Sequence, residues 1–541
     1  MNNIEPQQTT NIAATLATTC EAKQEAQGSR RDEKHSVVRM DQSAPPSSGR
    51  SCSVSMAESS MPSNAFVGSD GSLAPSGNPW TPPDENGTGG QEAYPFRNFW
   101  SVEGGLDEVL FAIPSREQAD ILVTAFFKYV DPLYPIIPEN LFRSRFEEFW
   151  ALPPIDRGKF NTTWVALLFI VLASGHIYVQ DPTAIDFTSV PETYLSCCYR
   201  ALCLVSFLSE WSLETIQVLI LICNYFVTST RTADCWTFSG ILQKIVYGLE
   251  LHLPPPASAS VSEKHLRYAL WQAFMFQDVS LSYFLELVPA SCHHSIDVSL
   301  LRPVDDGENN PDSRLEEMLL SERAHVDIAY LNNKADVAYQ RAMWQFSTFM
   351  QKNICIPTAL GRPIARDAAH KGGLLADLQS IYDNLDPPFH SIDFRGQQGR
   401  VWRQMIMVAS NYNLAFTMLH LAQNPATGVG IDWRGALKSS NKAMSAFFDL
   451  VNQDRQYLTM MTPINTRAYA QTLMICKVLS TAKEQTSGQE EPWLQLAVGN
   501  IERYMDLLHH ARGSFAFEVK KQEYLNVLWG YRELLSAGTV G

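Results

Sequence analysis

Apolar positions recur at intervals of three and four residues over most of the chain beyond Tyr94, which is the period of a helix that buries one face. In the first such segment a capping box, Ser115 followed by Gln118, precedes the run ADILVTAFFKYV. The same pattern predicts helices over residues 115–129, 141–150, 163–179, 194–208, 213–227, 235–251, 264–287, 338–350, 401–421, 437–451, 467–479 and 490–509. The first of these ends before Pro132, Pro135 and Pro138, because proline cannot occupy a helix interior.

Two of these segments, 163–179 and 213–227, are apolar on every side, which predicts helices enclosed by other helices. The run from Trp164 to Val179 is shorter than the roughly 18–20 residues that a membrane span needs, so we interpret it as a buried helix and expect no membrane contact. We find no convincing period-two strand and no repeat of fixed period. The predicted fold class is all-α, a large multi-helix bundle.

Residues 1–93 have a different composition. Phe66 and Trp80 are the only aromatic residues before Tyr94, and Ser, Pro and Gly supply 26 of the 50 residues from Asp41 to Gly90. Such a segment has too little apolar surface to offset the entropy of ordering, so we predict a disordered Ser/Pro/Gly-rich tail. A short basic cluster in this tail is a weak candidate for a nuclear-import signal: Arg30, Arg31 and Lys34.

The helical body contains one polar, acidic interruption at residues 303–323, with Gly307 and Pro311 as helix breakers. We interpret it as a surface loop between two halves of one domain. The halves are a helical core at residues 94–302 and a C-terminal helical half at residues 324–541.

The whole chain is acidic, with 57 Asp and Glu residues against 42 Lys and Arg residues and a formal net charge of −15. This balance argues against a surface that binds nucleic acid throughout. The ten cysteines are too few for a disulfide scaffold, and the start of the chain has no secretory signal pattern, so we expect an intracellular protein with reduced cysteines.

Motifs of metal or enzyme chemistry are missing from the sequence. It contains no Cys-x-x-Cys pair, and we interpret Cys197, Cys198 and Cys203 as core residues. The cluster Cys292-His293-His294 follows a proline in a predicted loop and remains a minor alternative as a metal site. There is no His-Glu-x-x-His, Gly-x-Ser-x-Gly or phosphate-binding Gly-x-x-x-x-Gly-Lys-Ser/Thr motif. We therefore expect no metal, no cofactor and no enzymatic activity, although carboxylate pairs leave no motif.

Four stretches, in this order, resemble one family. The first is Phe126–Tyr129 with Pro132-Leu133-Tyr134-Pro135-Ile136-Ile137 and Phe142, and the second is Leu167–Gly175. The third is Ser212-Leu213-Glu214-Thr215-Ile216-Gln217, then Trp236, Gly240 and Gly248-Leu249-Glu250-Leu251-His252. The fourth is Arg267–Trp271, Asp278, Pro289, Ile296-Asp297-Val298 and Pro303. Together they are similar to the fungal-specific transcription factor domain, the helical regulatory region usually found downstream of a binuclear zinc cluster.

The resemblance singles out eight motif residues, most of which we expect to be structural: Trp236, Gly240, Gly248, His252, Arg267, Trp271, Asp278 and Pro289. Trp236 and Trp271 are expected in the core, and Gly240 is expected to permit close helix packing. Asp278, on an otherwise apolar helix, needs a partner if it is buried. Arg267 or another cation is the expected structural partner, and contact with a ligand is the alternative.

The resemblance implies a nuclear transcriptional regulator, pathway-specific for a biosynthetic gene cluster. Its helical region would respond to a small-molecule effector, dimerise, or restrain an activation segment. The first hundred residues hold only Cys20 and Cys52, so this sequence shows no zinc cluster and no direct DNA contact is evident. Either the chain acts through a DNA-bound partner, or the gene model lacks an upstream exon that encodes the cluster. The expected partner is a DNA-bound regulator or a second copy of the chain. The alternatives are a helical enzyme or small-molecule-binding protein, and a scaffold or inhibitor that dimerises with intact zinc-cluster regulators.

Overall fold

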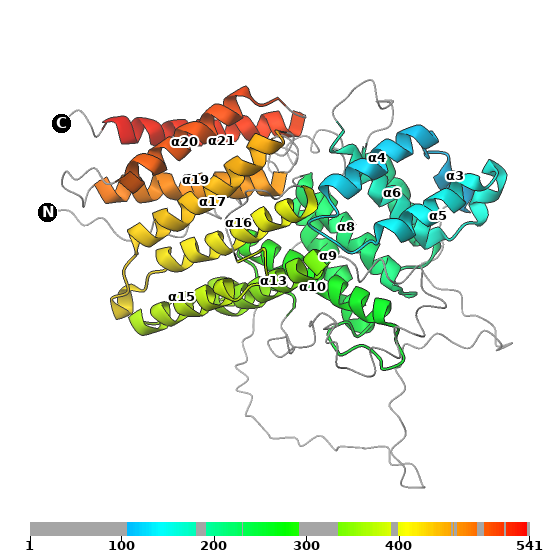
Figure 1. Cartoon of the computed structure of the whole chain (residues 1–541), viewed down its shortest axis with the longest axis horizontal. Coiled ribbons are helices and arrows are strands. Elements are labelled where there is room, and N and C mark those ends of the chain that lie inside the picture. The colour runs from blue at the N-terminus through cyan, green and yellow to red at the C-terminus, as the bar shows by residue number, and fades with distance from the viewer. Residues whose placement is uncertain are drawn as a thin grey trace, which may run out of the picture. The chain divides into compact units, whose positions relative to one another are not determined.

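The structure, a computed structural model, describes residues 105–179, 191–229, 231–291, 334–390, 399–455, 458, 462–483, 492–512 and 515–537. Within these ranges the chain forms helices and turns, with one isolated bridge between Asn424 and Val429 and no strand. The predicted all-α class is therefore confirmed for the described residues (Figure 1). The predicted tail at 1–93 and the acidic loop at 303–323 lie outside them.

The part of the chain before the predicted loop supplies the first group of helices. These are α3 (Gly105–Leu110), α4 (Arg116–Tyr129), α5 (Glu139–Ala151), the 3₁₀ turn η1 (Pro154–Lys159), α6 (Thr162–His176), α7 (Pro191–Leu204), α8 (Leu213–Thr228), α9 (Thr232–Gly248) and α10 (Val261–Leu285).

The second group follows the loop. It consists of α13 (Lys334–Met350), the π-helical turn η3 (Gln351–Cys355), α14 (Ile356–Ala359), α15 (Ala368–Asp383), α16 (Gly399–Leu421), the 3₁₀ turn η4 (Pro425–Thr427), α17 (Trp433–Gln453), α19 (Thr462–Lys483), α20 (Pro492–His510) and α21 (Phe515–Ala537). Four α-helices of the described residues, α3, α14, α15 and α21, were not among those predicted.

Helix boundaries follow the local chemistry of the sequence. The Ser115 hydroxyl accepts a hydrogen bond from the Gln118 backbone amide at 3.3 Å, so the predicted capping box does begin α4. Ser212 caps α8 in the same way through the Thr215 amide at 3.1 Å. The proline-rich segment then separates α4 from α5, as predicted.

The helices that are apolar on every side lie at the centre. Helix α6 packs against α4, α7 and α8, and α8 packs in turn against α9 and α10. In the second group, α15, α16, α17, α19 and α21 lie side by side in that order (Figure 1). The groups meet where α13 contacts α10 and α19 contacts α8. A single apolar cluster includes side chains from α3 to α21, so both groups share one core.

Candidate functional site

The proline-rich segment between α4 and α5 is held by side chains from three other helices. Its carbonyl oxygens cannot join a helical ladder, so they need other donors. Gln217 on α8 donates to the Ile136 carbonyl at 2.6 Å, and Gln340 on α13 donates to the Pro135 carbonyl at 3.1 Å. The Tyr339 hydroxyl donates to the Leu133 carbonyl at 3.2 Å, and the Gln404 side-chain amide donates to the Pro132 carbonyl at 3.1 Å. The segment thus connects both groups of helices.

A buried charge cluster lies beside this segment. Arg400 at the start of α16 donates to the carboxylate of Asp131, which is 2% exposed, and through Nε to Asp336 on α13 at 2.8 Å. The Asp131 Oδ1 atom has no hydrogen-bond partner. Burial, opposed by Arg400, raises the pKa of Asp131 to about 7. The cluster therefore holds two carboxyl groups around one guanidinium.

Asp278 holds the turn that follows α10. It is fully buried and accepts hydrogen bonds from the backbone amides of Ala290 at 3.0 Å and Ser291 at 2.9 Å, and from the Ser291 hydroxyl. Arg267, the expected partner, instead pairs with Glu263 at 2.9 Å. Burial raises the pKa of Asp278, and these donors oppose the shift. Its partners in the structure are thus amide and hydroxyl groups and not a cation.

Trp271 and His252 occupy one aromatic cluster. Trp271 is 1% exposed and lies near Tyr247, Trp344 and the His252 ring, with centroid distances of 5.8, 6.3 and 6.3 Å. Its predicted core position is confirmed. Trp236 is only partly buried and packs at the edge of the core.

The two motif glycines of α9 differ in their surroundings. A Cβ atom added at Gly248 would lie 2.2 Å from the Trp211 ring, whereas one added at Gly240 would meet nothing within 4 Å. The expectation of close packing at Gly240 is therefore wrong, and Gly248 occupies the tight position. Pro289 is buried in the turn that Asp278 holds.

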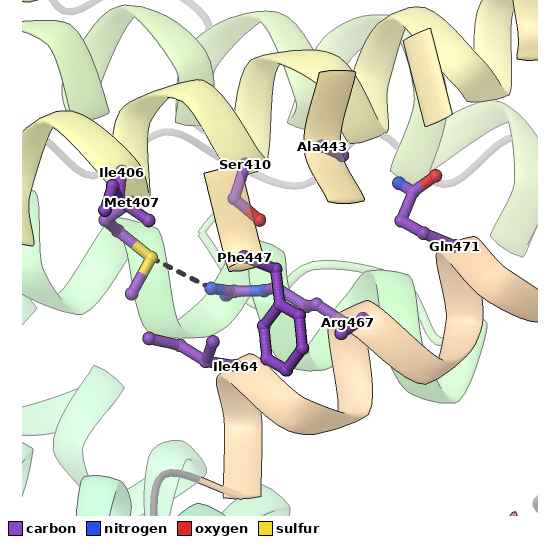
Figure 2. Close-up of a pocket in the computed structure, with 9 residues that line it drawn as sticks. Ile406, Met407, Ser410, Ala443, Phe447, Ile464, Arg467 and Gln471 are labelled. Carbon is purple, nitrogen blue, oxygen red and sulfur yellow. Dashed lines mark hydrogen bonds between the residues drawn. The ribbon is translucent and has the colours of Figure 1, made fainter. Parts of the chain in front are cut away.

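Arg467 is the most unusual charged residue of the interior. It projects from α19 and is 6% exposed, with its Nη1 atom 3.0 Å from the Met407 sulfur (Figure 2). It lines two small cavities, one on the side of Gln471 and the other on the side of Tyr283. Sequence reasoning missed it, because Arg467 stands in the polar first turns of its helix and resembles a surface residue there.

The described residues contain no group of three or more His, Cys, Asp or Glu side chains that could hold a metal ion. Cys197 and Cys198 are buried and Cys203 is partly buried, consistent with their interpretation as core residues. The cluster Cys292-His293-His294 and the basic cluster Arg30, Arg31 and Lys34 lie outside the described residues. None of the described helices is both long and apolar enough to cross a membrane.

Comparison with known proteins agrees with the resemblance seen in the sequence. Residues 123–350 match the family model described as the fungal specific transcription factor domain. This stretch contains the proline-rich segment, Gln217, the α9 and α10 motif residues and α13. A search of the solved structures finds no significant match.

Several curated fungal proteins are similar over part of their length. "Sorbicillinoid biosynthetic cluster transcription factor 2" of Penicillium rubens is 25% identical over 179 residues, which are 32% of this chain and 26% of that protein. An uncharacterized transcriptional regulatory protein of Schizosaccharomyces pombe is 24% identical over 43% of this chain and 36% of its own length. "Transcription factor yanR" of Aspergillus niger is 24% identical over 36% of this chain and 26% of its own length. The chain thus spans about a quarter to a third of these relatives.

Proposed function

We propose, from the premise that residues 123–350 are a fungal specific transcription factor domain, that this chain is a nuclear transcriptional regulator without catalytic activity. We further propose that it controls a biosynthetic gene cluster. One similar protein is named a biosynthetic cluster transcription factor, which supports this finer assignment.

The observation that supports a regulatory role most directly is the shared core. The matched domain does not end in a separate unit at residue 350, because Gln404 of α16 and Gln217 of α8 bind the same proline-rich segment. A shift of the helices in the second group would therefore also displace the proline-rich segment that the first group contacts. Such coupling between packed elements is what a regulatory domain needs in order to transmit a signal.

We propose that contact with DNA involves a protein partner, either a DNA-bound regulator or a second copy of this chain. The acidic balance of the sequence, a formal net charge of −15, supports this view. A net negative charge opposes binding to the phosphate backbone.

Two experiments test the proposal. Deletion of the gene should change transcript levels of a small set of neighbouring biosynthetic genes, whereas an unchanged transcriptome would refute the regulatory role. In the second experiment the full chain is fused to an unrelated DNA-binding domain and directed to a reporter promoter. Expression should rise or fall by several-fold relative to the DNA-binding domain alone, and an unchanged reporter would contradict a direct effect on transcription.

A further inference from the structure

Arg467 is a cation inside an apolar core whose charge its neighbours do not neutralise. Its guanidinium lies over the Phe276 ring, 5.7 Å from the centroid, and beside the Met407 thioether. No carboxylate of the described residues forms an ion pair with it, and its Nε atom has no hydrogen-bond partner. A ring face and a thioether are weak partners for a full charge, and a buried charge without a counter-ion is costly.

The groups that could interact electrostatically with Arg467 are three tyrosines, and all three are neutral. Tyr134, Tyr283 and Tyr339 are the residues whose ionised forms would interact favourably with the guanidinium. Burial raises the pKa of each phenol well above its ordinary value. None therefore supplies a negative charge at physiological pH, although burial also lowers the pKa of Arg467.

A second unused donor faces the same cavity as Arg467. Gln471 follows it by four residues on α19, so both side chains lie on one face of the helix. The Gln471 Oε1 atom lies 3.5 Å from the hydroxyl oxygen of Thr417, which donates its hydrogen to the Asn413 carbonyl at 2.8 Å. The Gln471 Nε2 atom is buried without an acceptor. Figure 2 shows both side chains extending from α19, Arg467 to Met407 of α16 and Gln471 one turn further along the helix. The Arg467 Nε and Gln471 Nε2 atoms are thus two buried donors without acceptors in residues that line one cavity, and a bound acceptor would satisfy them.

We propose that Arg467 and Gln471 form an interior site for a compact anionic group, either a halide ion or the carboxylate of a small apolar acid. Each of the two cavities beside Arg467 has a volume of about 10 Å³, enough for one particle the size of a water molecule. Ile406, Ala443 and Phe447 give the first cavity apolar walls. Met407 lines it as well, and this unbranched side chain can repack to admit a larger group.

Binding at this site would join both groups of helices. The guanidinium links α19 to Phe276 of α10 and to Met407 of α16. An anion here would neutralise the charge and tighten that junction. This consequence for regulation rests on the proposed function, whereas the binding itself rests only on the geometry and is measured without any transcriptional readout.

The test measures the melting temperature of the purified full chain at constant ionic strength. Potassium gluconate, whose polyol tail does not fit apolar walls, is replaced stepwise by potassium bromide or by potassium isovalerate. We expect the melting temperature of the wild type to rise by roughly 2–5 °C at a hundredfold excess over the dissociation constant. A response to bromide alone identifies a halide site, and a stronger response to isovalerate identifies an apolar acid. A wild type that responds to neither anion overturns the proposal.

Two variants show whether the response belongs to this site. Arg467→Met removes the charge and should abolish the response. Gln471→Glu places a carboxylate one helical turn from Arg467 in the wall of the same cavity, so it should raise the melting temperature and also abolish the response. Arg503→Met on the exposed face of α20 is the matched control and should respond as the wild type does. The proposal fails if Gln471→Glu, or a folded Arg467→Met, responds to the anions like the wild type. Failure here would leave the reporter experiment on the proposed function unaffected.

Discussion

The side-chain amide of Gln217 donates a hydrogen bond of 2.6 Å to the carbonyl of Ile136, a residue 81 positions earlier in the chain. Both atoms are buried, and the bond joins the start of α8 to the proline-rich segment before α5. Two of the sequence stretches that resemble the family therefore meet at one point.

Removal of this amide should destabilise the domain. Gln217→Met keeps the length of the side chain and leaves the Ile136 carbonyl buried without a donor, which costs about 1–3 kcal/mol in the free energy of unfolding. Urea denaturation measures the change. The matched control is Gln379→Met on α15, where the glutamine is exposed and bonds only to Asp383 one turn away. An equal loss in both variants would contradict the assigned role of Gln217.

A second prediction concerns the glycines. A Cβ atom at Gly175 would lie 2.0 Å from the backbone carbonyl oxygen of Leu122, so Gly175→Ala should push α6 away from α4 and cost at least about 1–3 kcal/mol. At Gly240 the added methyl group meets open space within a helix, and Gly240→Ala should raise stability by up to about 1 kcal/mol. Thermal unfolding of the two variants under one set of conditions provides the comparison. A destabilised Gly240→Ala together with an unaffected Gly175→Ala would refute it.

The helical class and most helix positions could be predicted, because apolar residues at intervals of three and four require no knowledge of tertiary structure. The ends of α13, α17 and α19 extend beyond the predicted ranges, since their polar terminal turns carry no apolar period. Helix α15 was missed where Gly372 and Gly373 weaken the helical signal.

The contacts of the candidate site could be predicted only in part. Asp278 was correctly singled out as a polar group on an apolar helix, but its partner was not identified. Eleven residues separate it from Arg267 on α10, which is about 16 Å along the axis and too far for an ion pair. Gln340 and Gln404 were missed because a lone glutamine within an apolar run has no spacing signature. The one sequence signal that could have identified these two glutamines is their position on the apolar face of a helix.

A third prediction follows from the partners of Asp278. Asp278→Ala leaves the Ala290 and Ser291 amides without their acceptor and should lower the free energy of unfolding by about 2–4 kcal/mol. Hydrogen exchange of residues 286–291 should rise strongly in this variant. Arg267→Met should leave the exchange of this turn unchanged, because Arg267 contacts Glu263 and the Leu249 carbonyl instead. Protection of the turn that depends on Arg267 would restore the ion-pair interpretation.

The last prediction concerns the pH dependence of stability at Asp131. Its folded-state pKa is raised to about 7 from the ordinary value of 3.8, mainly by burial, with smaller contributions from the charges of Asp336 and Glu139. The folded state therefore holds a proton that the unfolded chain releases between about pH 4 and pH 7. Stability from this group is fully present below about pH 4 and declines as the pH rises through that window. The shift corresponds to at most about 4 kcal/mol.

Asp131→Asn remains neutral at every pH and should flatten this decline. The measurement is the free energy of unfolding of wild type and variant in urea at intervals from pH 4.5 to pH 7.5. As the pH rises, the free energy of unfolding of the variant should increase relative to that of the wild type. Asp120→Asn on the exposed face of α4 serves as the control and should follow the wild type. If the ion pair with Arg400 outweighed the effect of burial, the pKa of Asp131 would lie below its ordinary value. The free energy of unfolding of the wild type would then increase relative to that of the variant as the pH rises. The sign of the slope therefore decides which of the two forces, burial or charge pairing, governs the cluster that connects the proline-rich segment to α13 and α16.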